Sequence, residues 1–75
     1  QALVGHVGLF LALRYPRMPE GERAASAMVS VATVHSVVDL ASRIPTDFRA
    51  LVIREAHAML VSHYSGLDAR YGASA

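Results

Sequence analysis

Apolar residues recur at spacings of three and four along most of the chain, which is the periodicity of a helix face. Prolines and a glycine interrupt the pattern and divide it into three segments, at about residues 2–15, 19–43 and 47–64. No stretch alternates apolar and polar residues for long enough to favour a strand. The sequence therefore predicts an all-α fold of three helices, the last two long and antiparallel, with a frayed tail over residues 68–75.

The predicted helix ends rest on residues that start or stop helices. Tyr15 precedes Pro16, and a residue before proline is driven out of the α-helical region, so the first helix should end there. Pro19 suits the first turn of the second helix, because its missing N–H needs no partner in that turn. Thr46 is a good N-cap for the third helix. Gly66, followed by an apolar residue, is typical of a Schellman stop at its end.

The two long predicted helices carry more apolar surface than one helix packed on the other would cover. The second has a stripe of small and β-branched residues, and the third has a wide apolar arc. Such surplus surface needs another part of the same chain or a second copy. We expect two antiparallel hairpins of this kind to pair as a four-helix bundle.

Composition narrows the class of protein. The 75 residues are 53% hydrophobic and only 17% charged, which excludes an intrinsically disordered chain. A chain this short buries only about 60% of its unfolded surface, so a very apolar one is expected to have a partner. The absence of cysteine excludes disulfides and Cys-ligated metal. The basic residues are scattered arginines, which offer no patch for nucleic acid or anionic lipid.

The start of the chain bears on localisation. Gln1 opens an apolar stretch, which we interpret as a processed chain or the remainder of a longer protein. The apolar run from Leu3 to Leu13 is shorter than the roughly 20 residues of a membrane span. A basic segment and cleavage site of a signal peptide are also missing. We therefore expect no membrane association, and the richness in Ala, Val and Arg without Lys or Asn favours a bacterial source.

Four histidines raise the question of a metal or catalytic site. His35 and Asp39, four residues apart on a helix, are the one pair with plausible ligand spacing. Such a pair is more often hydrogen-bonded or solvated than metal-bound. The sequence has no H-E-x-x-H, no G-x-S-x-G and no phosphate-binding loop. We expect no enzyme activity, no metal and no cofactor.

His6 and Phe10 lie one turn apart on the first predicted helix and would line a pocket beside Gly5. The simpler interpretation makes Phe10 a core residue and His6 a satisfied or rim histidine. The residues alone leave both interpretations open.

Three stretches carry a family resemblance: Tyr15-Pro-Arg-Met-Pro-Glu-Gly-Glu-Arg-Ala-Ala, the break Pro-Thr-Asp-Phe, and Ile53-Arg-Glu-Ala-His-Ala-Met-Leu-Val-Ser-His-Tyr. Their arrangement resembles the C-terminal part of TetR-family transcriptional regulators. The resemblance covers nearly all of residues 2–67 and consists of helix lengths, breaks and composition. The family's helix-turn-helix has no counterpart in this sequence, so no DNA-contacting residue is carried over.

The resemblance implies a part of a cytoplasmic, ligand-controlled repressor that binds DNA only through a missing N-terminal domain. The last two helices would form a homodimer, and the first would lie beside a pocket for a small apolar molecule, lined by His6 and Phe10. By position, the dimer seam would consist of Val31, Val34, Val38, Ala41, Val52, Ala56, Met59 and Leu60. The alternative is a self-contained helical protein–protein interaction module without a ligand.

Overall fold

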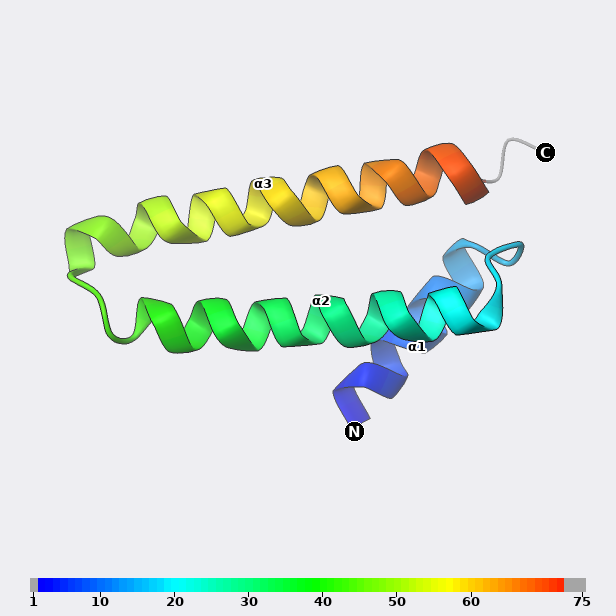
Figure 1. The fold of residues 1–75 in the computed structure, drawn as a ribbon, viewed down its shortest axis with the longest axis horizontal. Coiled ribbons are helices and arrows are strands. Elements are labelled where there is room, and N and C mark those ends of the chain that lie inside the picture. The colour runs from blue at the N-terminus through cyan, green and yellow to red at the C-terminus, as the bar shows by residue number, and fades with distance from the viewer. Residues whose placement is uncertain (1, 73–75) are drawn as a thin grey trace.

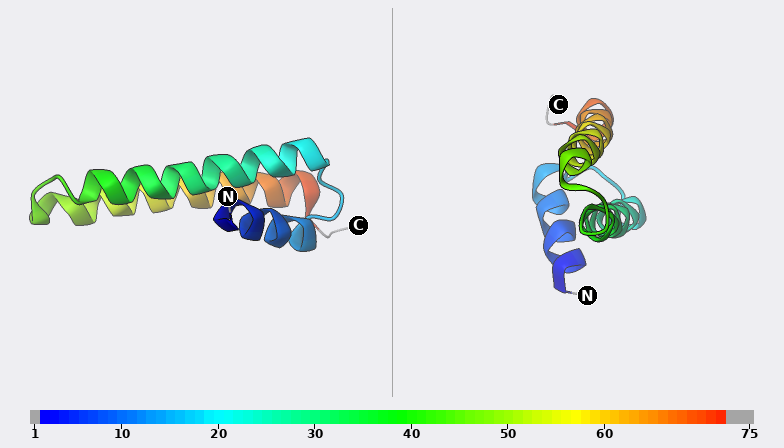
Figure 2. Two further views of the ribbon diagram at one scale, coloured as in Figure 1. Left: turned by 90° about the horizontal axis from the view of Figure 1, so that it is seen from below. Right: turned by 90° about the vertical axis from the view of Figure 1, so that its left-hand side faces the viewer.

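The computed structural model describes residues 2–72, which form three helices joined by two short turns. Helices α1 (Ala2–Arg14), α2 (Glu20–Ala41) and α3 (Thr46–Tyr71) follow in chain order. Helices α2 and α3 form a long antiparallel hairpin, and α1 lies against one half of it (Figure 1, Figure 2). No strand occurs within the described range, so the predicted all-α fold of three helices is confirmed.

A proline is the N-cap of each long helix, so α2 begins one residue later than predicted and α3 one residue earlier. Pro19 is the N-cap of α2 and Pro45 the N-cap of α3, each with an extended backbone. The prediction of Thr46 as an N-cap is therefore wrong, and α3 begins without a side-chain cap. The physical reason is that the Pro45 carbonyl already accepts the N–H groups of Phe48 and Arg49, at 3.0 and 3.1 Å. Thr46 is thereby drawn into the first turn.

The predicted stop of the third helix at residue 64 is also wrong. Helix α3 continues through Gly66 to Tyr71, and no described glycine has the positive φ that a Schellman stop requires. Leu67 is only 1% exposed, and the Asp68 carboxylate accepts a hydrogen bond from Tyr15. These tertiary contacts hold residues 68–71 helical, and Gly72 is the C-cap of α3. Residues 73–75 of the predicted frayed tail lie outside the described residues.

The hydrophobic core occupies the half of the hairpin that α1 covers. It consists of Leu11, Tyr15, Met18, Ala27 and Leu67, which come from all three helices and the first turn. Burying a leucine side chain stabilises a fold by about 1.5–3 kcal/mol, and both core leucines are at most 1% exposed. The core therefore fixes α1 across one end of the hairpin.

Polar contacts join α2 to α3 in the same half. The Ser26 hydroxyl lies 2.8 Å from Nε2 of His63, and the Ser30 hydroxyl lies 2.8 Å from the Tyr64 hydroxyl. Both serines are 7% exposed, so these hydrogen bonds satisfy groups that would be costly to bury alone. The two long helices are thus tied by side-chain hydrogen bonds at the α1 end.

Candidate functional site

The solvent exposure of one apolar stripe on α2 changes along the helix. Ala27, Val31, Val34, Val38 and Ala41 follow one another at spacings of four and three, which places them on one face. Ala27 and Val31 are 1% and 4% exposed, whereas Val34 and Val38 are 44% and 63% exposed. Helix α1 therefore covers only the first half of the stripe.

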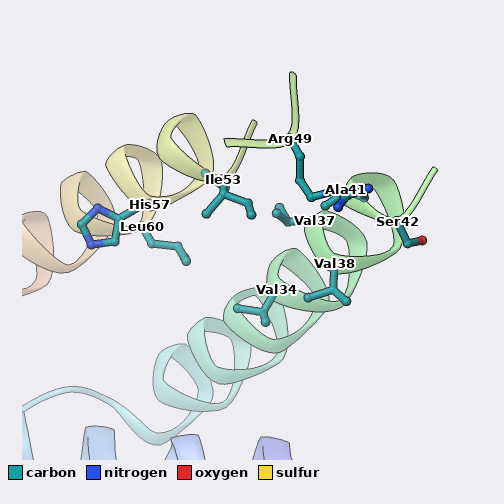
Figure 3. A pocket seen from close by; sticks show the side chains of 10 residues that line it. Val34, Val37, Val38, Ala41, Ser42, Arg49, Ile53, His57 and Leu60 are labelled. Atoms are coloured by element: carbon teal, nitrogen blue, oxygen red, sulfur yellow. Dashed lines mark hydrogen bonds between the residues drawn. The ribbon is translucent and has the colours of Figure 1, made fainter. Parts of the chain in front are cut away.

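Beyond α1, the trough between α2 and α3 is an open groove of about 660 Å³ (Figure 3). This volume falls within the range of about 300–1,000 Å³ that is usual for small-molecule sites. The α2–α3 groove, as we call it, is mostly apolar, and its lining contains no aspartate or glutamate. It is lined by Val34, Val37, Val38, Ala41, Ser42, Arg49, Ile53, Ala56, His57 and Leu60.

Arg49 is positioned at the end of the groove next to the α2–α3 turn. Its Nε donates to the Ala41 carbonyl at 2.6 Å, and its Nη2 lies 3.4 Å from the Ile44 carbonyl. These contacts connect the first turn of α3 to the end of α2. Because a guanidinium carries five N–H donors, Arg49 retains donors that these two carbonyls do not use.

The structure brings together part of the predicted dimer seam. Five of its eight residues line the groove: Val34, Val38, Ala41, Ala56 and Leu60. Val31 is only 4% exposed, whereas Met59 is 70% exposed. Neighbouring helical residues point about 100° apart, so Met59 and Leu60 present different faces of α3. Val52 and Met59 are not part of the groove lining.

The predicted ligand contacts lie away from this groove. His6 and Phe10 are exposed on α1, and neither lines the groove or a second hollow of about 290 Å³ near the α1 end. A Cβ placed on Gly5 would meet nothing within 4 Å, so no neighbour approaches α1 closely there. The pocket at His6 and Phe10 stays a prediction.

Sequence reasoning missed five lining residues: Val37, Ser42, Arg49, Ile53 and His57. A signal for three of them was present, because Arg49, Ile53 and His57 are spaced by four and share one face of α3. The spacing alone did not reveal that α1 stops short of this face.

Two tyrosines at the α1 end of the hairpin have raised pKa values. Burial raises the pKa of Tyr15, and its hydrogen bond to Asp68 raises it further. The Tyr15 hydroxyl donates to Asp68 at 2.7 Å, and Arg14 reaches the same carboxylate at 3.3 Å. The pKa of Tyr71 is raised chiefly by its hydrogen bond to Glu22. Charged and phenolic groups thus link α1 and α2 to the last turns of α3.

Groups suited to a metal do not converge in residues 2–72, where no three His, Asp or Glu side chains lie close enough together. The Asp39 carboxylate, a predicted candidate with His35, forms an ion pair with Arg43 instead. Both partners of that pair are well exposed, which is typical of a weak surface interaction.

Helix α2 is also long and apolar enough to cross a membrane by length and composition alone. Within the described fold, α2 buries Ser26, Ala27, Ser30 and Val31. A core helix of a soluble protein passes the same test, so the finding is weak evidence for a membrane.

The fold and groove define a helical domain whose long hairpin is covered on one half only. A family profile described as "Tetracyclin repressor-like, C-terminal domain" matches residues 1–63. The chain belongs to this family, whose members are parts of transcriptional regulators, and the resemblance found in the sequence is confirmed. No curated protein and no solved structure matches the chain.

Proposed function

We propose that the chain is the dimerisation and small-molecule-sensing part of a bacterial, cytoplasmic TetR-like repressor. Membership of the tetracyclin repressor-like family supports a role in transcription regulation. The observation that carries the proposal is the exposed apolar surface of α2 and α3, on which Val34, Val38 and Met59 are 44–70% exposed. DNA binding belongs to another part of the parent protein.

The proposed partner is a second copy of the chain. A two-fold pairing places the same patch of each copy against the other, so the exposed valines of one hairpin cover those of its partner. Removing this apolar surface from water supplies the driving force. The product is a four-helix bundle made of α2 and α3 from both copies.

Sensing requires that the small apolar molecule prefer one arrangement of the dimer. A ligand shifts such an equilibrium only by its differential affinity for the two arrangements. His6 and Phe10 are the proposed contacts on α1, and their exposure means that other helices of the parent would enclose the ligand.

The alternative is a self-contained interaction module without a ligand. It is favoured by one observation: the three helices share a core of their own, with Leu11, Ala27 and Leu67 at most 1% exposed. Such a module would dimerise through the same hairpin and would bind no small molecule.

The test of the proposed dimer is the molar mass of the chain in solution, measured by sedimentation together with circular dichroism. We expect a helical species near twice 8.0 kDa. A helical monomer at every concentration would contradict both the regulator and the module interpretations of the hairpin.

A further inference from the structure

We infer that the α2–α3 groove binds a medium-chain carboxylic acid, with the carboxylate on Arg49 and the chain along the apolar walls. This site is separate from the proposed contacts at His6 and Phe10. Its expected effect on the dimer rests on the proposed function, whereas the binding itself does not.

The apolar walls favour an extended hydrocarbon chain. The groove continues the trough that α1 occupies at the other end, where Leu11 is 0% exposed. Seven of the ten lining residues are Val, Ile, Leu or Ala. Along α3 the lining runs from Arg49 to Leu60, a length of about 16 Å at the helical rise of about 1.5 Å per residue. An extended acyl chain of medium length matches this distance.

The charged residues of the groove favour a ligand with a carboxylate over one with an ammonium group. Its ionisable lining residues are Arg49 and His57, and no carboxylate lines it. An ammonium head group would therefore find no acidic partner there, whereas a carboxylate pairs with the planar guanidinium of Arg49. Because Arg49 is already held by the Ala41 and Ile44 carbonyls, little side-chain freedom is lost on binding.

Acid binding and dimerisation would bury the same side chains. Val34, Val38 and Leu60 line the groove and also belong to the predicted dimer seam. An apolar side chain buried by the acid is no longer available to a second copy. A saturating acid is therefore expected to shift a dimer towards monomer by mass action.

Calorimetric titration with dodecanoate, dodecanol and dodecyltrimethylammonium tests the site directly. We expect dodecanoate to bind and the other two to bind at least about tenfold more weakly, as expected for loss of a charge-assisted contact. R49Q should weaken dodecanoate binding by about ten- to a hundredfold. R54Q, which removes an exposed arginine of α3 outside the groove, is the matched control and should bind as the wild type does.

A second pair of variants covers the case in which R49Q disturbs the turn. A56F fills the groove and keeps the Arg49 contacts, so it should abolish dodecanoate binding. A58F adds the same side chain at an exposed position outside the lining and should leave binding intact. Circular dichroism checks that each variant is helical.

The outcomes separate this inference from the proposed dimer. Equal binding of dodecanoate and dodecanol, or binding insensitive to A56F, overturns the acid site whatever the molar mass. A dimer that binds no dodecanoate also overturns it and leaves the dimer standing. A monomer that binds dodecanoate through Arg49 supports the site and contradicts the dimer.

Discussion

At the scale of single residues, Gly66 has a different role from the one its sequence context indicates. The pattern Ser-Gly-Leu predicts a helix stop, yet Gly66 lies inside α3 with a negative φ. A Cβ added to it would meet nothing within 4 Å. Glycine therefore contributes nothing here that alanine would not, and it costs α3 backbone entropy.

This placement predicts that Gly66→Ala stabilises the protein. Alanine restricts the unfolded chain and is the better helix former, so the free energy of unfolding should rise by about 0.5–1 kcal/mol. Urea unfolding followed by circular dichroism measures the change.

The comparison variant is Gly72→Ala at the C-cap of α3, where a Cβ would collide with the Asp68 carbonyl. It should destabilise the protein. A loss of stability in Gly66→Ala would mean instead that Gly66 ends the helix in a left-handed conformation.

At the scale of elements, the chain just after α1 is joined to α3 by the contact of Tyr15 with Asp68, residues that lie 53 positions apart. Tyr15 is 2% exposed and Leu67, next to Asp68, is 1% exposed. The last turns of α3 are therefore anchored by α1, because this contact and the adjacent core would be lost if the helix ended at Tyr64.

The tyrosine contact predicts a loss of stability in alkali. The pKa of Tyr15 in the folded state lies above the ordinary value of 10.0, so folding favours the protonated phenol. Its contribution is complete below pH 10 and is lost as the pH rises through the folded pKa. Unfolding by urea should show a lower stability at about pH 11 than at about pH 8.

Tyr15→Phe should flatten this pH dependence, at a cost of about 1 kcal/mol in neutral solution from the lost hydrogen bond. Tyr71 titrates in the same direction, because its hydrogen bond to Glu22 raises its pKa. The stability of the double variant Tyr15→Phe/Tyr71→Phe should depend on pH even less. An unchanged slope in both variants would show that neither phenol is held as described.

At the scale of the whole molecule, the hairpin is covered unevenly. Its extents of 45 × 26 × 14 Å describe a thin, elongated body, and α1 lies beside only one half of α2 and α3 (Figure 2). Large apolar side chains are exposed on the other half, among them Val38 and Met59. This uneven burial is the physical reason to expect a partner.

Val34→Glu tests the partner surface. Val34 is 44% exposed in the single chain, so the monomer should stay folded, but the dimer would bury an unpaired carboxylate. We expect the dimer dissociation constant to rise by about a hundredfold or more, measured by sedimentation.

Val29→Glu is the matched control for that measurement. Val29 lies on the same helix and is 60% exposed, but it is outside the predicted seam. It should leave the molar mass unchanged. A Val34→Glu protein that remains dimeric at low concentration would show that the seam lies elsewhere.

The sequence by itself determined the number of helices, their order and the family. The prolines at 16, 19 and 45 act through covalent geometry, since each restricts φ and lacks an N–H. Their effect needs no distant neighbour, and it was correctly predicted to within a few residues. The apolar stripe from Ala27 to Ala41 was likewise visible from its spacing.

Only the tertiary structure decided where α3 ends and which part of the apolar surface forms a groove. The end of α3 depends on contacts of Leu67 and Asp68 with residues far away in the chain. The groove depends on where α1 lies and on the tie from Arg49 to Ala41 across the turn. Such packing between distant segments leaves no local pattern in the sequence, because each segment would look the same without its neighbour.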